Sequence, residues 1–151
     1  MYFYRKYQYC LKFIFCLLCT LFRRKSRTKY MPNSLSTPQN QTVQEAEKYL
    51  CENFMNESLN REVIAAHLKI SCAYLSEIFK KNTQKTLPQY LNELRISKAK
   101  ELLQNTHNRV TEIAYEVGFR NFDHFIRVFK SFERVTPTEF RGKCIKAMKG
   151  R

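Results

Sequence analysis

The feature that most constrains the fold is a pattern of helical spacing that occurs twice along the chain. In residues 109–141 a short apolar helical face ends at Gly118, where a left-handed residue could terminate a helix. A second apolar face follows almost at once, behind Asn121 as an expected N-cap. The first face comprises Val110, Ile113, Ala114 and Val117, and the second comprises Phe122, Phe125, Val128, Phe129 and Phe132. Two short helices joined by a tight turn predict a helix-turn-helix, a shape whose second helix can enter a DNA major groove.

The same spacing occurs upstream, in residues 63–81. Ile64 corresponds to Ile113 before the turn, and Phe79 corresponds to Phe129 after it. The offset is 49 residues before the turn (113 − 64) and 50 after it (129 − 79), so the second turn holds one additional residue. A repeat of this length predicts a structural unit that occurs twice. Two units imply two DNA-recognition helices.

Capping patterns divide the rest of the sequence into helices. Capping boxes are expected at Thr42 with Glu45, at Thr86 with Gln89 and at Thr136 with Glu139, and single N-caps at Asn60 and Ser71. The helix after Thr86 runs to about Gln104 and is near 25 Å long at about 1.5 Å per residue. The expected buried residues are Val43, Ala46, Leu50 and Phe54 in the first helix, and Leu87, Leu91, Leu94, Ala99, Leu102 and Leu103 in the long one. The predicted fold class is all-α, with about seven helices that form two helix-turn-helix units joined by a long connecting helix.

Residues from both units carry a resemblance to a known family. They are Tyr74-Leu75-Ser76, Phe79-Lys80, Tyr90, Arg95, Ala99, Leu102-Leu103, Ile113-Ala114, Gly118-Phe119, Phe125, Phe129-Lys130, Val135-Thr136-Pro137 and Phe140-Arg141. With this spacing kept throughout, residues 42–142 resemble the DNA-binding domain of the AraC/XylS family of bacterial transcription regulators. The resemblance implies sequence-specific DNA binding by two recognition helices. The chain departs from the family at Lys69, Gln84 and Arg134, where a Gly is usual at a turn or helix end, so each must adopt or avoid a left-handed conformation at some cost.

Outward positions on the two recognition helices are the candidate DNA contacts. They are Ala73, Ser76, Glu77 and Lys80 in the first helix, and Asp123, His124, Arg127 and Lys130 in the second. Arg127 can donate two hydrogen bonds to guanine, whereas Lys80 and Lys130 suit phosphates. Asp123 or Glu77 can accept a hydrogen bond from a cytosine amino group. A plain surface ion pair between Asp123 and Arg127, four residues apart, is the alternative for that pair.

Charge is concentrated at the two ends of the chain. The net charge is +14, from 27 Lys and Arg residues against 13 acidic ones. Residues 1–32 hold eight basic residues and no acid, and residues 141–151 hold five and no acid, which leaves 14 basic and 13 acidic residues between them. A DNA-binding surface must therefore arise from segregation of charge within the repeats rather than from their total.

Residues 1–30 combine tyrosines and basic residues with an uncharged run, residues 13–22. Ten helical residues span about 15 Å, whereas a bilayer core is about 30 Å thick, so this run alone does not cross a membrane. Three interpretations stay open: a membrane-surface anchor, the remnant of a spanning helix from a longer membrane-tethered regulator, or an unstructured segment before a start at Met31. Residues 31–41 are predicted to be a linker, and residues 143–151 a basic tail.

No constellation of residues points to catalysis. The three histidines are scattered, and the Cys16–Cys19 pair, with C-x-x-C spacing, lies in an apolar run without a second pair. We expect no enzyme activity, no catalytic or metal site and no cofactor, and no small-molecule site is evident. The six cysteines show no secreted framework and are expected to be reduced thiols of a cytoplasmic protein.

The expected partner is double-stranded DNA, bound in a sequence-specific way to regulate transcription. This interpretation allows two further partners. One is RNA polymerase. The other is a membrane, contacted through residues 1–30, in which case the cytoplasmic protein would be tethered to the inner face of the membrane. Two rival functions stay open. The domain could be the output module of a membrane-tethered signalling regulator, or a non-specific nucleic-acid-binding or architectural protein.

Overall fold

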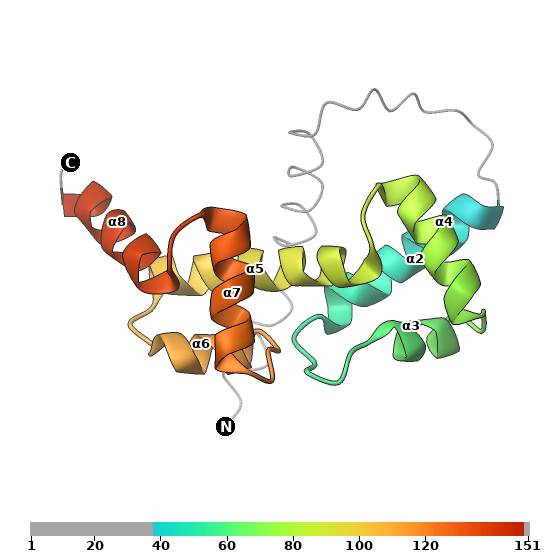
Figure 1. Ribbon diagram of the computed structural model, residues 1–151, viewed down its shortest axis with the longest axis horizontal. Coiled ribbons are helices and arrows are strands. Elements are labelled where there is room, and N and C mark those ends of the chain that lie inside the picture. The colour runs from blue at the N-terminus through green and yellow to red at the C-terminus, as the bar shows by residue number, and fades with distance from the viewer. Residues whose placement is uncertain (1–37, 150–151) are drawn as a thin grey trace, which may run out of the picture. The chain divides into compact units, whose positions relative to one another are not determined.

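The computed structural model of the protein describes residues 38–149, which form seven α-helices and no strand (Figure 1). The helices are α2 (Pro38–Asn53), α3 (Arg61–His67), α4 (Cys72–Thr83), α5 (Leu87–Asn105), α6 (Val110–Glu116), α7 (Phe122–Glu133) and α8 (Pro137–Lys149). The long helix α5 contacts α4 of the first repeat, and α6, α7 and α8 of the second. The predicted all-α class, with two helix-turn-helix units on a long connecting helix, is confirmed.

The two repeats keep the register that the sequence predicts. The start of α6 lies 49 residues after the start of α3 (110 − 61), whereas the start of α7 lies 50 residues after that of α4 (122 − 72). The first turn holds four residues between the helices and the second holds five, residues 117–121. Arg120 is the additional residue, because Phe119 corresponds to Ile70 and Asn121 to the N-cap Ser71.

Predicted caps set most of the helix starts. Side chains of Asn60, Ser71, Thr86 and Asn121 each accept a hydrogen bond from the backbone N–H three residues on. The capping boxes expected at the N-termini of α5 and α8 are both formed. The Thr86 N–H donates to Gln89 Oε1 at 2.9 Å, and the Thr136 N–H donates to Glu139 Oε2 at 2.7 Å.

The start of α2 differs from the prediction. The helix begins at Pro38, so a cap at Thr42 is wrong, and residues 38–41 of the predicted linker are helical. The fixed φ of a proline suits the first turn of a helix, and the polar residues after Pro38 fit its exposed side. At the other end, α8 continues to Lys149 and includes residues 143–149 of the predicted basic tail. Residues 1–37 and 150–151, with the predicted amino-terminal segment, lie outside the described residues.

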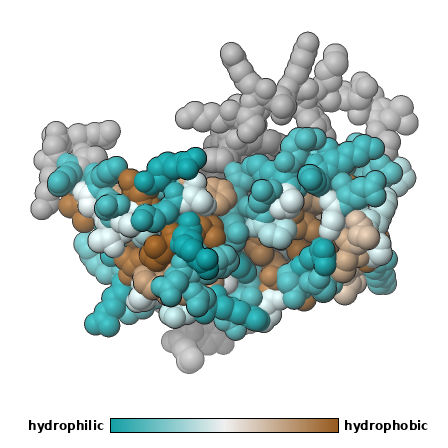
Figure 2. All heavy atoms as spheres, viewed as in Figure 1, coloured by the Kyte–Doolittle hydropathy of each residue, from teal (hydrophilic) through white to brown (hydrophobic). Residues whose placement is uncertain are grey.

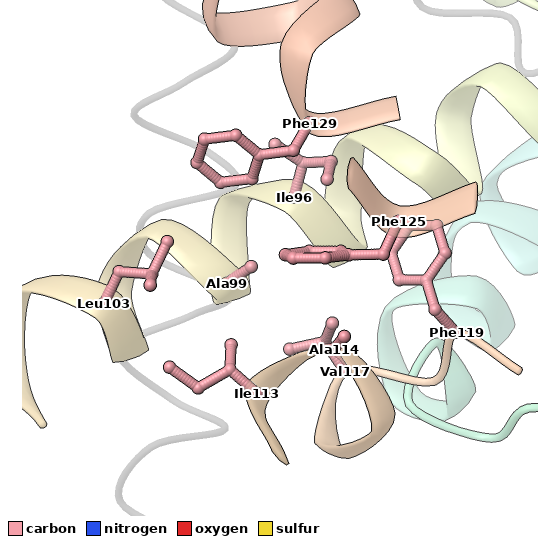
Figure 3. Close-up of a cluster of buried hydrophobic side chains, with 9 residues drawn as sticks. All are labelled: Ile96, Ala99, Leu103, Ile113, Ala114, Val117, Phe119, Phe125 and Phe129. Carbon is pink, nitrogen blue, oxygen red and sulfur yellow. The ribbon is translucent and has the colours of Figure 1, made fainter. Parts of the chain in front are cut away.

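A cluster of nine buried side chains holds α5, α6 and α7 together (Figure 3). It comprises Ile96, Ala99, Leu103, Ile113, Ala114, Val117, Phe119, Phe125 and Phe129. The predicted inner face of the first helix is also buried: Val43, Ala46 and Leu50 lie in α2, and Phe54 directly follows its last residue.

Two core predictions need correction. Leu102 is only partly buried, while its neighbour Leu103 is fully buried. Phe132 is 42% exposed, although the helical period places it on the side of Phe129. Phe132 lies in the last turn of α7, and a helical period does not tell where the neighbouring helices end. Within residues 38–149 no helix has the length and apolar character that a membrane crossing requires.

Candidate nucleic-acid interface

Each recognition helix is set by a turn with the same backbone hydrogen bonds. In the first turn the Ile70 N–H donates to Ala65 O at 3.0 Å, and in the second the Phe119 N–H donates to Ala114 O at 3.0 Å. The left-handed position is held by Lys69 at φ 55° and by Gly118 at φ 94°. Both turns therefore present α4 and α7 in the same way, despite the additional residue in the second turn.

The buried side of α4 matches that of α7. Leu75 and Phe79 are buried in α4, and their counterparts Phe125 and Phe129 are buried in α7. Since these pairs are 50 residues apart (125 − 75 and 129 − 79), the helices pack at equivalent rotations about their axes. The sides facing away from these core residues are consequently equivalent surfaces.

Seven of the eight candidate residues lie exposed on those surfaces. They are Ala73, Glu77 and Lys80 of α4, and Asp123, His124, Arg127 and Lys130 of α7. Ser76 is only half-buried, and its hydroxyl donates to the Cys72 carbonyl at 2.8 Å, so this hydroxyl is held within the helix. Figure 2 shows that hydrophilic side chains cover most of the face drawn, with hydrophobic patches between them.

The register of the repeats adds one surface residue that the candidate set missed. His124 corresponds to Tyr74 (124 − 74 = 50), and Tyr74 is 39% exposed. Ser76 instead corresponds to Ile126, which packs against the buried cluster of the second repeat. The burial pattern thus favours Tyr74 over Ser76 as the outward residue, and applying the repeat offset to His124 would have found it.

Within residues 38–149 the charged candidates form no ion pair with one another or with other side chains. In the described residues the ion pairs join Arg61 to Glu62, Lys85 to Glu93, Lys98 to Glu101 and Lys100 to Glu133. None of these involves Arg127, and no ion pair joins Arg127 to Asp123 within residues 38–149. In this described part of the chain the Arg127 guanidinium is thus exposed and not engaged by a carboxylate. Each helix also carries a lysine one position past its last core phenylalanine, Lys80 and Lys130.

A metal-dependent chemistry finds no support in this part of the chain. Among residues 38–149 no group of His, Cys, Asp or Glu side chains is arranged to hold a metal ion. Cys72 and Cys144 form no disulfide in this part of the chain. The predicted Cys16–Cys19 pair lies outside the described residues.

Comparison with known proteins decides the family. Residues 64–143 match a protein family described as a helix-turn-helix domain. The chain is 39% identical over 102 residues to an uncharacterised HTH-type transcriptional regulator of Pseudoalteromonas carrageenovora, covering 68% of this chain and 60% of that one. It also matches a transcriptional regulator of Chromobacterium violaceum, described as containing an AraC-type DNA-binding domain, with 28% identity, a TM-score of 0.62 and 69% and 92% of the two chains covered. The chain belongs to the AraC/XylS family.

A second solved structure agrees with the AraC/XylS assignment. The C-terminal domain of AraT, a response regulator from Geobacillus stearothermophilus, superposes with a TM-score of 0.67 at 30% identity, covering 71% of this chain and 88% of that domain. The AraC/XylS family consists of DNA-binding transcription regulators, which are not enzymes. The chain spans between 35% and 60% of the length of the first curated relatives it matches.

Proposed function

We propose that this AraC/XylS chain regulates transcription by binding a specific duplex sequence, with α4 and α7 in successive segments of the major groove. The observation that carries the proposal is the equivalence of the two helices. Each buries the same positions against the protein, and each leaves the opposite side exposed and rich in hydrogen-bonding groups. A protein with two equivalent recognition helices can contact two DNA segments about one duplex turn apart.

The length of α5 supports this spacing. Its 19 residues give about 28 Å at about 1.5 Å per residue. Successive major-groove segments on one side of a duplex are about 34–36 Å apart. A connecting helix of this length is of the size needed to hold two recognition helices at that separation.

The residues of the two surfaces suggest distinct roles. Arg127 suits bidentate hydrogen bonding to guanine, and Lys80 and Lys130 suit backbone phosphates. Glu77 and Asp123 suit a cytosine amino group, while Ala73, Tyr74 and His124 lie where the first turn of each helix would enter the groove. Ser76 contributes through its position at the edge of this surface rather than through a free hydroxyl.

Selection from randomised duplexes, followed by affinity measurements, tests the proposal. We expect a selected motif with two parts, bound at least about 10³-fold more tightly than bulk DNA at physiological salt. A ratio near one, with a steep salt dependence, would instead indicate the non-specific binder. The measurement thus separates the two DNA-binding functions.

The division of the chain into segments, and its binding to RNA polymerase and to a membrane, stay predictions. We expect residues 42–142, with the flanking helical residues 38–41 and 143–149, to be the DNA-binding domain. Association with RNA polymerase would show in transcription from a template carrying the selected site. For residues 1–30, fusion to a soluble reporter separates the open interpretations, because a membrane anchor or spanning remnant would sediment the reporter with membranes, whereas an unstructured segment would leave it in solution.

A further inference from the structure

The loop that follows α2 lies against the turn of the second helix-turn-helix. We call residues 54–58 of this loop the bridging loop. If Gly118 carried a Cβ atom, that atom would lie 2.8 Å from the Met55 carbonyl oxygen and 2.9 Å from the Phe54 carbonyl oxygen. Such distances are shorter than real Cβ contacts allow, so a residue with a side chain could not sit there without a shift of backbone. The second turn is therefore in direct backbone contact with the first half of the domain.

Arg95 of α5 hydrogen-bonds to the same loop. Its Nε donates to the Phe54 carbonyl at 2.8 Å and its Nη2 to the Asn56 carbonyl at 2.9 Å. The guanidinium also lies over the ring of Phe119, 5.5 Å from its centroid. Arg95 is only 8% exposed, and its burial, together with the nearby Arg120, lowers the pKa of the guanidinium. One side chain thus contacts the bridging loop and the second turn at once.

The additional residue of the second turn completes this set of contacts. Arg120 donates from Nη2 to the Ser58 hydroxyl at 3.0 Å, at the far end of the bridging loop. The loop itself is ordered by its own hydrogen bonds, from the Asn56 N–H to Asn53 O at 2.9 Å and from the Ser58 N–H to Asn56 Oδ1 at 2.9 Å. The residue that makes the offset 50 instead of 49 is therefore one that reaches the bridging loop.

We propose that Gly118, Arg95 and Arg120 clasp the bridging loop and so fix the separation and orientation of the two recognition helices. Without the clasp, α5 alone would determine how the two helix-turn-helix units are placed. With the clasp, the protein accepts only one spacing between the two DNA segments that it binds. Arg95 and Arg120 are positioning residues for DNA binding, and the effect on DNA rests on the proposed function.

The clasp differs from an ordinary core contact because two of its members are exposed. Ser58 and Arg120 lie at the surface, so removing their hydrogen bond leaves the buried cluster intact. Arg95 donates to two backbone carbonyls from two different nitrogens of its planar guanidinium, and a lysine at this position lacks that two-nitrogen geometry. The clasp can thus be weakened in steps by substitutions that leave the hydrophobic core side chains in place.

The first experiment measures binding of the whole chain to a set of duplexes in which the spacer between the two parts of its selected site is lengthened or shortened by single base pairs. Wild-type protein should bind one spacing and lose at least about tenfold on each neighbouring one. Arg95→Lys should bind the best spacing about 5- to 30-fold more weakly and discriminate less among spacings. Ser58→Ala and Arg120→Ala should broaden the same profile to a smaller extent, and their agreement excludes a mere loss of the Arg120 charge.

Matched controls keep the result specific. Ser97→Ala removes an exposed serine hydroxyl of α5, and Arg61→Ala removes an exposed cation whose partner is the adjacent Glu62. Both should keep the wild-type spacing profile. A profile for Arg95→Lys as sharp as that of wild type, at the same optimum, would overturn the proposal.

A second measurement makes the clasp testable apart from the DNA. Residual dipolar couplings of the free protein should fit one alignment tensor for both helix-turn-helix units in wild type, and two tensors in Arg95→Lys. If wild type shows no specific DNA binding, the proposed function fails while the couplings still decide the clasp. One common tensor in Arg95→Lys would overturn the clasp, whatever the outcome with DNA.

Discussion

The two turns of the repeats share their backbone hydrogen bonds but differ in the residue at the left-handed position. Lys69 holds this position in the first turn at φ 55°, and its side chain is exposed. Gly118 holds it in the second turn, with two carbonyl oxygens within 3 Å of where a Cβ would be. A glycine is needed in the second turn for the approach of another segment of backbone, and not only for its φ. The comparison shows that equivalent positions of a repeat can be constrained for different physical reasons.

The recognition helices differ in a complementary way. Their buried sides are equivalent, whereas their exposed sides pair Ala73 with Asp123 and Glu77 with Arg127. The fold constrains the buried side in both copies, because a change there opens a cavity or overfills the core. The exposed side is free of that constraint, so the two helices are able to contact different bases.

The largest expected effect is at the second turn. Gly118→Ala should destabilise the domain by about 2–5 kcal/mol, since the left-handed backbone costs about 1–2 kcal/mol for an L-residue and the overlap with the carbonyls adds about 1–3 kcal/mol. Lys69→Ala is the matched control. It replaces one L-residue by another at the same φ and should change stability by no more than about 0.5 kcal/mol. Urea unfolding followed by circular dichroism measures both, and a cost below about 1 kcal/mol for Gly118→Ala would contradict the close approach.

The exposed sides give the next effect, which is on DNA binding. Arg127→Ala should weaken binding to the preferred site by about 1–3 kcal/mol and relax the preference at one base pair. Glu77→Ala, at the equivalent position of α4, should alter the preference at a different base pair in the other part of the site. Lys130→Ala should weaken all sequences about equally, because a phosphate contact carries no base information. Selection on randomised duplexes separates these outcomes, and an unchanged motif for Arg127→Ala would end its assignment as a base contact.

Local patterns in the sequence were enough to predict most of the fold. The caps at Asn60, Ser71, Thr86, Asn121 and Thr136 depend on residues three or four positions apart, and so does the period of the buried faces. The sequence also shows Lys69, Gln84 and Arg134 at positions where the family usually has glycine, and all three residues adopt positive φ.

Contacts between distant segments were not predictable in the same way. The buried Arg95 is an example. The two carbonyls that accept its hydrogen bonds are 41 and 39 residues away in the sequence, and nothing in the local pattern of α5 indicates them. The exposure of Phe132 likewise depends on which helices lie near the end of α7. On the candidate surface, seven outward positions followed from the period of the helices, whereas the half-buried Ser76 required its neighbours in space.

A smaller effect is expected where α4 and α7 end. Gln84 and Arg134 are equivalent C-caps, at φ 58° and 62°, so replacing either by Gly should relieve left-handed strain. Arg134→Gly should stabilise by up to about 1 kcal/mol. Gln84→Gly should gain less, because its side chain donates to the Lys81 carbonyl at 2.9 Å and that hydrogen bond is lost. Thermal melting of both variants tests the ranking, which is contradicted if Gln84→Gly is the more stable of the two.

The smallest expected effect distinguishes the two capping boxes by pH. Thr86 is paired with Gln89, which does not titrate, whereas Thr136 is paired with the carboxylate of Glu139 at the equivalent position. Hydrogen bonds from the Thr136 backbone and hydroxyl lower the pKa of Glu139. A carboxyl whose pKa is lower in the folded chain stabilises the fold above its unfolded pKa and loses that contribution as pH falls through the folded value. Because Glu139 is exposed, we expect the change in stability to be slight and to show best in local spectra.

Nuclear magnetic resonance can follow both boxes in a single titration. The Thr136 amide resonance should shift as the pH falls below the ordinary carboxyl value of 4.5, while the Thr86 amide resonance stays in place. Glu139→Gln makes the second box chemically equivalent to the first, since a glutamine amide oxygen still accepts from the backbone but does not titrate. This variant should abolish the shift of Thr136 and keep the start of α8. A Thr136 shift that persists in Glu139→Gln would assign the pH response to another group and leave the two boxes alike in this respect.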